Sequence, residues 1–576
     1  MSSSKPAIFA REATGLVREV GFVLGVIIIL SHVVGLGWQK RAFQFTGPKP
    51  VPTDALPLGL PAIFWAFLIC GVIVMITGYA AGYVTAAMPR SGGGYVTISR
   101  VLHPFVGYNA GWLMFLAEAF SYGLIGVAVF EAIMIFFNIA GVAIAFDAMT
   151  LFIGGVVIIA IFTALALFGV RLYGWIMQAM FWPTLVITIG FFAMWIAGAM
   201  DPGIVATGVE TALGATPKVF VDMALNPPVA LSTAETPVLG LVADTVTFYD
   251  AFSYALAGAF WAYMGWYSVT FIAGEIKEAN KKLPKVVVVS GLIIMLVYLG
   301  ASSFSAWSTM SVEPTTDGKW SFFQAYSYLS YVPDLNDATV KAALTDQIPK
   351  FQPAWSTGIA SIIAQGMGLG WLSLLIAVAG VLWLANDIPP FLLVASRTMF
   401  AMSFDRMMPE KLAEVSERWH SPTWALIITG IFGIVGCIAE ANPVVADIAL
   451  GDYVAFAGVV GTDIYDATFL TLFCISCMLL ALERKEIYDR AAVKHSVGTV
   501  VGLGALATLL SGYCLFTFVK ESVGFIFAPA KISDLASCLG FWGCIAVGAL
   551  LYISYMYRNT TKGIDMRTLY LSIPPE

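Results

Sequence analysis

The stretch Ser31-His32-Val33-Val34-Gly35-Leu36-Gly37-Trp38 interrupts a long apolar run between Val20 and Phe45. Glycine has no Cβ and leaves helical geometry at little cost, so a membrane helix can break at Gly35 and Gly37. Broken backbone is tolerated in a bilayer where it is buried in protein or lines a cavity. The second half of such a helix would aim free N–H groups at an anionic group. In the alternative interpretation, the two glycines only let neighbouring helices pack closely.

The composition is that of a membrane protein. Of the 576 residues, 59% are hydrophobic and 11% are charged, whereas soluble domains carry roughly 25% charged residues. Apolar runs of about 20 residues recur along the chain, and each can cross a hydrocarbon core of roughly 30 Å. We expect an all-α integral membrane protein with about twelve transmembrane helices, at residues 20–45, 61–87, 104–139, 149–169, 173–200, 248–279, 284–309, 371–402, 422–439, 453–482, 496–519 and 535–557.

A second interruption, Phe260-Trp261-Ala262-Tyr263-Met264-Gly265-Trp266-Tyr267, lies five spans after the first. Interrupted helices at corresponding positions of two five-helix halves are typical of a 5+5 inverted-repeat secondary transporter. The predicted divisions are an N-terminal cytoplasmic segment (1–19), a first repeat (20–200), an extracellular loop (201–247), a second repeat (248–482) that contains another extracellular loop (310–356), two additional helices (483–558) and a cytoplasmic tail (559–576).

The distribution of basic residues predicts the orientation. With the N-terminus inside, 21 of the 30 Lys and Arg residues fall on the cytoplasmic side and nine on the other. The positive-inside rule therefore places both termini in the cytoplasm and both long loops outside. We expect a multi-pass protein of the cell membrane.

Other patterns are weak evidence for cofactors. Cys474 and Cys477 form a C-x-x-C inside an apolar run, with no second pair or histidine nearby, so lipid-compatible small side chains are favoured over a zinc or redox site. The run Gly92-Gly93-Gly94 lacks the G-K-[ST] of a phosphate loop. No metal and no cofactor are expected, apart from H⁺ or Na⁺ as a coupling ion.

Four motifs carry a family resemblance by their order and spacing. They are Val33-Val34-Gly35-Leu36-Gly37, then Pro89-Arg90-Ser91-Gly92-Gly93-Gly94-Tyr95 with Gly107 and Gly111-Trp112, then Phe260-Trp261-Ala262-Tyr263-Met264-Gly265-Trp266, and finally Ser396-Arg397-Thr398-Met399-Phe400-Ala401-Met402 with Asp405 and Pro409. Together they resemble the amino acid–polyamine–organocation superfamily of transporters, and in particular its amino acid permeases, which have the LeuT-type fold with discontinuous first and sixth helices.

The sequence also departs from this family. Glu275-Ile276-Lys277-Glu278-Ala279 stands where the family usually has E-x-K-N-P. Many proton-coupled members carry a lysine in the fifth helix, and the matching position here is Thr184. A lysine-based proton switch is therefore unsupported, and Thr184 is left as the candidate for ion or proton coupling at that position.

The resemblance implies how an amino acid would be held. Its α-carboxylate would lie on the N–H groups around Leu36 and Gly37, and its α-ammonium would face carbonyls near Val33, Trp261 and Met264. Half-helix N-termini favour anions and unwound carbonyls favour cations, which agrees with this assignment. The remaining substrate-binding candidates are Gly35, Glu118, Tyr263, Gly265, Tyr267 and Phe391.

Ionisable groups inside spans are costly and commonly functional. His32 lies at the first interruption and is a coupling candidate, or alternatively a neutral imidazole bonded to a neighbouring helix. Asp387 precedes Pro389-Pro390, which loosen the backbone, and either carries a proton, helps to hold Na⁺ or is structural. Glu118 is expected near the middle of its span, where it lines the substrate pocket or is structural.

Other charged residues are expected nearer the outer surface. Glu131, Asp463 and Asp466 are predicted to lie in a water-exposed vestibule. Arg41 follows the first interruption, and we expect it to form a gate with Trp261 by pairing with one of the two aspartates.

The charge of Glu118 decides the predicted substrate class, because it is expected to be the only carboxylate able to reach the substrate. An ionised Glu118 would favour a cationic side chain, since an unpaired buried charge is costly. A protonated Glu118 would suit apolar or aromatic amino acids. The aromatic lining expected from Trp261, Tyr263, Tyr267 and Phe391 favours the neutral case, although rings also hold cations.

We therefore expect a secondary active transporter, a symporter or antiporter that moves amino acids by alternating access. The alternatives are a carrier of polyamines or other organocations, and an amino acid receptor that does not transport. An enzyme is disfavoured, because no nucleophile–base set is visible in the sequence. The expected partners are an amino acid substrate and the lipid bilayer, without nucleic acid, and both a monomer and a homodimer are compatible with the sequence.

Overall fold

The computed structural model describes residues 9–11, 15–139, 147–231, 240–243, 246–333, 335 and 337–575. Within these ranges the strands are limited to one antiparallel hairpin, β1 (Val444–Val445) and β2 (Ile448–Ala449). Eleven helices of the described part are long and apolar enough to cross a membrane. The chain is thus an all-α membrane protein, as the apolar runs predict.

The long helices coincide closely with the apolar runs. They are α1 (Phe22–Val33) with α2 (Leu36–Gln44), α3 (Ala62–Ala87), α5 (Pro104–Ile139), α6 (Ala148–Ala166), α7 (Val170–Met200), α12 (Ala279–Met310), α16 (Gly370–Phe404), α17 (Thr423–Ala441), α19 (Val459–Glu483), α21 (Val497–Glu521) and α23 (Ile532–Thr561).

One predicted span, residues 248–279, is not a single helix. Its α-helical part, α11 (Phe248–Tyr263), ends after 16 residues and is followed by two 3₁₀ turns, η4 (Ser268–Phe271) and η5 (Ala273–Glu275). Gly265 lies between α11 and η4 with φ +92°, a conformation that is unfavourable for residues with a Cβ. This is why the apolar run continues while the α-helix stops, and why the count of long helices is one lower than predicted.

Shorter elements connect the long helices. The α-helices are α4 (Gly93–Val101), α8 (Pro202–Leu213), α9 (Pro217–Leu225), α10 (Gly240–Ala243), α13 (Phe322–Tyr331), α14 (Ala338–Gln347), α15 (Ser356–Gly366), α18 (Leu450–Tyr453), α20 (Lys485–Arg490), α22 (Val523–Phe527) and α24 (Met566–Leu571). The 3₁₀ turns are η1 (Thr53–Ala55), η2 (Pro57–Gly59), η3 (Val229–Leu231), η6 (Glu410–Ala413) and η7 (Ala455–Ala457).

The two segments expected as polar loops, 201–247 and 310–356, contain several of these short helices. Local capping signals explain them. The Asp201 side chain accepts a hydrogen bond from the Gly203 N–H at the start of α8, where Pro202 occupies the first helical position, a combination that favours helix initiation. Asp337 caps α14 in the same way, with its carboxylate 2.7 Å from the Thr339 nitrogen.

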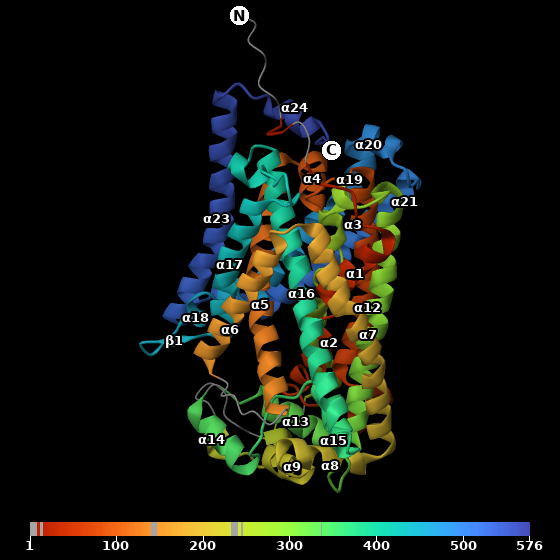
Figure 1. Cartoon of the computed structure of the whole chain (residues 1–576), viewed down its shortest axis with the longest axis vertical. Helices are drawn as coiled ribbons and strands as arrows, with labels where there is room; N and C mark the ends of the chain where they lie inside the picture. Colours follow the sequence, from red (N-terminus) through yellow and green to blue (C-terminus); the bar gives the residue numbers. More distant parts are fainter. Residues whose placement is uncertain are drawn as a thin grey trace, which may run out of the picture.

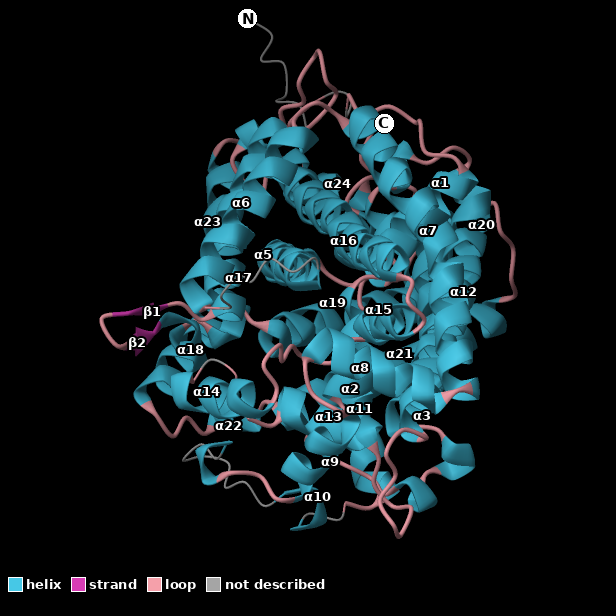
Figure 2. Cartoon of the chain, turned by 60° about the horizontal axis from the view of Figure 1, so that its bottom comes forward, coloured by secondary structure: helices cyan, strands magenta, loops and turns pink. Residues whose placement is uncertain are grey.

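The molecule is elongated, and its two ends differ. The C-terminus, α4, α20 and α24 lie at one end of the long axis, whereas α8, α9, α13, α14 and α15 cover the other (Figure 1). Figure 2 brings this second end forward and shows the short helices spread across it. The long helices run between the two ends, with α5 packed along α16, α3 along α12 and α19 along α21.

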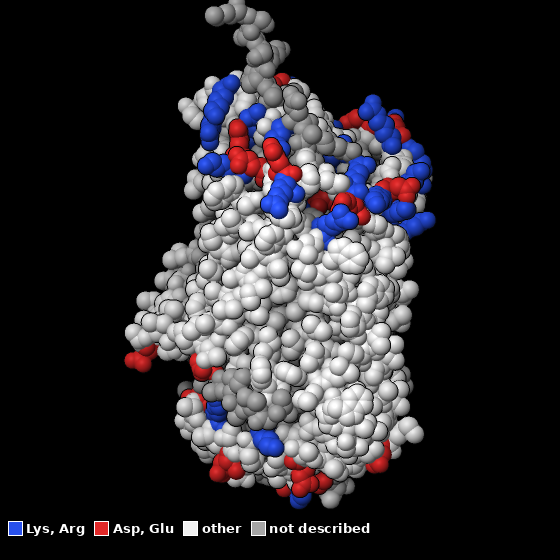
Figure 3. Space-filling model, viewed as in Figure 1, with Lys and Arg blue, Asp and Glu red and all other residues white. Residues whose placement is uncertain are grey.

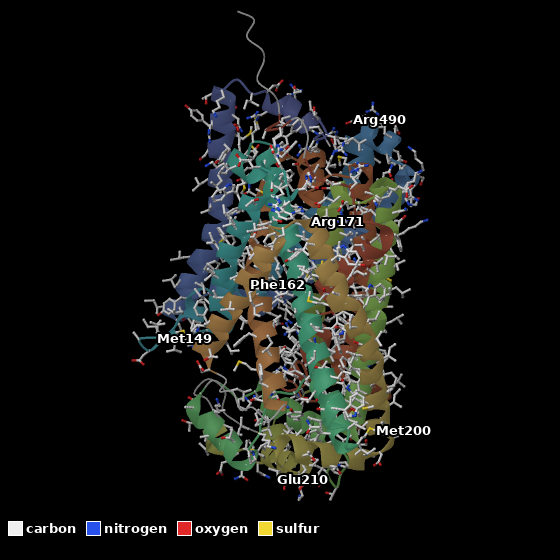
Figure 4. All side chains as sticks on the ribbon, viewed as in Figure 1. Met149, Phe162, Arg171, Met200, Glu210 and Arg490 are labelled. Atoms are coloured by element: carbon white, nitrogen blue, oxygen red, sulfur yellow. The ribbon has the colours of Figure 1, made fainter. Side chains whose placement is uncertain are left out.

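Charged side chains follow the same division. Lys and Arg gather at the end that holds α20 and α24, while on the face shown a broad band across the middle carries almost no charge (Figure 3). Figure 4 shows Arg490 at this basic end, Arg171 towards it, and Met200 and Glu210 at the opposite end. The uncharged band is the surface that a hydrocarbon core would cover.

Buried ion pairs join the helices near the basic end. Arg100 on α4 forms a bidentate pair with Asp405, at 2.5 and 2.8 Å, and the hydroxyl of Tyr95 donates to the same carboxylate. Arg397 on α16 forms a second bidentate pair with Glu275 of η5, at 2.8 and 3.1 Å. Bidentate guanidinium–carboxylate geometry is the arrangement that best offsets the cost of burying the charges.

Candidate functional site

A cavity lies between α1, α2, α5, α11, α16 and α19. About 530 Å³ of space there, including space open to solvent, is not filled by atoms. The lining residues are His32, Val33, Leu36, Gly37, Ala117, Glu118, Ser121, Leu124, Ile125, Trp261, Ala262, Met264, Gly265, Asp387, Phe391, Thr462, Asp463 and Asp466.

The first interruption supplies backbone donors to this cavity. α1 ends at Val33 and α2 begins at Leu36, while Gly35 has φ −114° and ψ −109°, outside the helical region. The first N–H groups of a helix have no partner within it, and Leu36 and Gly37 at the start of α2 both line the cavity. The N-terminal end of α2 therefore offers hydrogen-bond donors and a positive dipole end to a ligand.

The second interruption comes very close to the first. A Cβ added to Gly265 would lie 2.8 Å from ring carbons of His32, so glycine allows the two segments to approach. Among the described residues no hydrogen bond reaches the carbonyl of Met264, whereas the Trp261 carbonyl accepts the Met264 N–H at 3.0 Å. The residues that line the cavity thus include Leu36 and Gly37, which carry backbone donors, and Met264, whose carbonyl is free of hydrogen bonds within the described chain.

Tyr298 of α12 links the two interruptions. Its hydroxyl is shared between the carbonyls of Val33 and Ala262, 2.6 Å from the latter. The Val33 carbonyl also accepts the N–H of Gly35 at 2.9 Å, so both of its lone pairs are engaged. Sequence reasoning missed Tyr298, because it lies in an apolar span outside every motif.

Four carboxylates line the cavity. Glu118 Oε2 lies 3.3 Å from His32 Nε2, although the two atoms do not have the geometry of a hydrogen bond. Asp466 accepts a hydrogen bond from the Tyr267 hydroxyl, and Asp387 lies directly against Gly35. Asp463 makes no hydrogen bond with the part of the chain that the structure describes. All four residues are buried, with at most 5% of their surface exposed.

The burial of Asp463 and Asp466 contradicts two predictions. Both were expected in a water-exposed vestibule, yet they are buried beside Glu118, and Glu118 is therefore not the only carboxylate that can reach a ligand. α19 begins at Val459 and contacts α5 and η7, and all its residues from Gly461 to Ala467 are buried. Glu131, the third of this group, is only partly buried, with its carboxylate 3.6 Å from Lys40 Nζ.

Several predicted binding or coupling residues do not line the cavity. The Tyr263 hydroxyl points to α3 and donates to the Phe67 carbonyl at 3.0 Å. Tyr267 is not a lining residue, but its hydroxyl donates to Asp466, which is one. Gly35 is in contact with the side chain of Asp387 and is not itself a lining residue. The hydroxyl of Thr184 donates to the Met180 carbonyl of its own helix at 2.6 Å.

Arg41 does not form the expected ion pair with a carboxylate of α19. No ion pair of Arg41 is found within the described ranges; its guanidinium lies over the Trp261 ring, 3.8 Å from the ring centre, and donates to Gln44 at 2.5 Å. The two residues predicted to gate the site, Arg41 and Trp261, are therefore in contact with each other through a cation–π interaction.

Neighbouring polar groups fix the cavity walls. The Asn386 amide, one residue before Asp387, donates to the Ser31 hydroxyl at 2.7 Å. The Gln39 amide donates to the carbonyls of Gly35 and Gly380, at 3.2 and 3.3 Å. These contacts tie α1 and α2 to α16, and sequence reasoning assigned no role to Asn386 or Gln39.

Comparison with known proteins identifies the family of the chain. The model of the family described as amino acid permease matches residues 21–550. The chain belongs to the amino acid permease family. It is 22% identical over 311 residues to the branched-chain amino acid permease BcaP of Bacillus subtilis, covering 53% of this chain and 50% of the relative. It is also 22% identical over 289 residues to the mouse b(0,+)-type amino acid transporter 1, covering 50% of this chain and 51% of the relative.

The match spans about half the length of these curated relatives. Family membership points to a permease and not to an enzyme, as the sequence predicts. This amino acid permease thus has its cavity at the two interruptions that carry the family motifs.

Proposed function

We propose that this permease is a secondary active transporter that carries amino acids across the cell membrane by alternating access. The observation that supports this most strongly is the cavity at which two helix interruptions meet. Broken helices around a central cavity are the usual substrate site of inverted-repeat transporters. The printed names of the relatives, which are amino acid permeases and transporters, favour an amino acid as the substrate.

The substrate backbone would be held by main-chain groups. The N–H groups of Leu36 and Gly37 suit the α-carboxylate, because they are unpaired within α2 and carry the positive end of its dipole. The free carbonyl of Met264 suits the α-ammonium. The Val33 carbonyl, engaged by Tyr298 and Gly35, would take part only if Tyr298 turned away.

The proposed architecture is a 5+5 inverted repeat with α1/α2 and α11/η4 as its discontinuous helices, followed by α21 and α23. The concentration of Lys and Arg at the end with α20 and α24 supports a cytoplasmic location for that end (Figure 3). The short helices α8, α9, α13, α14 and α15 would then face the outside.

Two clusters are suited to act as gates. On the side of the short helices, Arg41 lies on Trp261, which itself lines the cavity. On the basic side, Arg397 of α16 holds Glu275, which follows the second interruption. Opening towards the cytoplasm would require this pair to separate, because it joins the interrupted segment to α16.

Coupling to H⁺ or Na⁺, or exchange of substrates, would use Asp387 and His32. Asp387 lies against Gly35 at the first interruption. The affinity of this carboxylate for a cation or a proton would therefore change with the conformation of the interruption. Thr184 is given no role, because its hydroxyl bonds within its own helix and it is absent from the cavity lining.

Uptake into proteoliposomes tests this function. We expect purified protein to accumulate at least one of the twenty radiolabelled amino acids, and unlabelled substrate on the inner side to accelerate entry by counterflow. Runs with and without pH and sodium gradients identify the coupling ion. Saturable binding without uptake would instead support a receptor, and uptake of polyamines but of no amino acid would support an organocation carrier.

A further inference from the structure

We propose that the cavity selects amino acids with a cationic side chain, and that Glu118, Asp463 and Asp466 hold the distal positive group. This inference rests on the proposed transport function and specifies its substrate class. It reverses the preference for neutral substrates that the aromatic residues of the sequence suggest. The reason is the charge balance of the cavity wall, which depends on how the helices are assembled.

The lining carries an excess of acidic groups. Glu118, Asp387, Asp463 and Asp466 face one imidazole, that of His32, and none of the lining residues found in the described chain is Lys or Arg. Even with His32 protonated, the acids outnumber the bases by four to one. Buried charges that remain unpaired are costly, so such a cavity favours cations or protons as its contents.

Hydrogen bonding leaves some of these oxygens unused. Glu118 Oε2 and Asp387 Oδ1 are enclosed and have no hydrogen-bond partner, and the two residues are 2% and 4% exposed. Buried polar atoms in proteins nearly always have a partner. Unpartnered acceptors that face a cavity are therefore positions for donors supplied by a ligand.

The nearest basic side chains are engaged elsewhere. Arg41 is held over Trp261 and by Gln44. Lys40 Nζ lies 3.6 Å from Glu131 Oε2 and 5.7 Å from the centre of the Trp355 ring. Among the described residues neither one forms an ion pair or a hydrogen bond with an acid of the cavity, although Arg41 attracts Asp463 over a longer distance.

The positions of the acids separate two parts of the cavity. Asp387 lies against Gly35, beside the α2 N-terminus where the substrate backbone would be held. Glu118 is on α5, while Asp463 and Asp466 are on α19, and these helices pack against each other. A zwitterionic backbone is neutral overall, so a second positive group that reaches α5 and α19 would distinguish the preferred substrates. Trp261 and Phe391 in the lining add ring faces that attract cations.

Three ligands of similar length isolate the two charged ends. L-Lysine has both the backbone carboxylate and a distal ammonium, L-norleucine lacks the ammonium, and cadaverine lacks the carboxylate. Their affinities for the full-length purified protein are measured by isothermal titration calorimetry at pH 7. We expect L-lysine to bind at least tenfold more tightly than L-norleucine, which corresponds to about 1.4 kcal/mol.

Matched variants test the assignment to residues. Asp463→Asn should lower the lysine-to-norleucine affinity ratio at least tenfold, because no hydrogen bond within the described ranges occupies its carboxylate, and Glu118→Gln should lower it in the same direction. Glu521→Gln, which removes an exposed carboxylate outside the cavity, should leave the ratio unchanged. The ratio of the unmodified protein decides the substrate class even if a variant fails to fold.

The outcomes separate the two proposals. Equal or tighter binding of L-norleucine would overturn the cationic preference while supporting amino acid recognition. Cadaverine binding as tightly as L-lysine would overturn the role of the α2 N-terminus and the amino acid assignment with it. A lysine preference that persists in Asp463→Asn and Glu118→Gln would overturn the assignment to these carboxylates. If neither L-lysine nor L-norleucine binds but another amino acid is taken up, this inference fails and the transport function stands.

Discussion

Gly37→Val is expected to abolish amino acid uptake, with a loss of at least a hundredfold, about 2.8 kcal/mol. A Cβ at this position would lie 2.7 Å from both the Ala262 Cβ and the Tyr298 hydroxyl oxygen, and the β-branched valine adds two further methyl groups. The side chain would push α2 away from α11 and cover the N–H groups proposed to bind the carboxylate. Uptake and binding of the best substrate are measured together in proteoliposomes and in detergent.

The control is Gly190→Val on α7, because a Cβ there meets no atom within 4 Å. Both variants should purify as folded, monodisperse protein, since one crowded contact in a chain of this size need not unfold the bundle. Wild-type affinity and uptake in folded Gly37→Val would show that the start of α2 does not bind the substrate.

Asp387→Asn is expected to remove gradient-driven accumulation, lowering the steady-state concentration ratio at least tenfold, about 1.4 kcal/mol. Exchange of labelled for unlabelled substrate should be affected much less. An amide keeps the shape of the side chain but neither releases a proton nor contributes negative charge to a Na⁺ site. Asp387 lies directly against Gly35, so its charge is positioned to bias the first interruption.

Asp447→Asn in the β1–β2 hairpin is the matched control. Asp447 is exposed and has φ +64°, a conformation that asparagine tolerates well. Accumulation that keeps its dependence on pH and sodium gradients in Asp387→Asn would exclude Asp387 as the coupling group.

The fold was largely predictable because the length of an apolar run reports directly on a membrane span. The predicted span 104–139 has the same bounds as α5. The interruption predicted at residues 260–267 coincides with the end of α11 at Tyr263 and with the positive φ of Gly265. The apolar sequence does not reveal that 3₁₀ turns follow in place of an α-helix. Capping pairs such as Asp201-Pro202 could have indicated the short helices within the presumed loops.

The site was predictable where a motif fixes backbone geometry. Leu36, Gly37, Trp261 and Met264 were named from the two glycine-containing interruptions, and all four line the cavity. Asp463 was misplaced because its position along a span does not reveal which helix covers it.

Contacts between spans that are far apart in the sequence could not be predicted either, because the position of a residue along its span does not reveal which helix lies next to it. Tyr298 joins both interruptions through one hydroxyl, yet its neighbours in the sequence are apolar and carry no motif. The charge excess that decides the proposed substrate class arises likewise from four acids on three separate helices, α5, α16 and α19.

Alternating access is tested most directly by whether the cavity between the two interruptions opens to both sides of the membrane. Ser121 lines it, so Ser121→Cys is made in a background with the two half-buried cysteines, Cys538 and Cys544, replaced by serine; the other five are buried. A membrane-impermeant maleimide is applied separately to right-side-out and inverted vesicles, with and without substrate. Alternating access predicts labelling from both faces, slowed by the transported amino acid. Labelling from only one face, whether or not substrate is present, would contradict it.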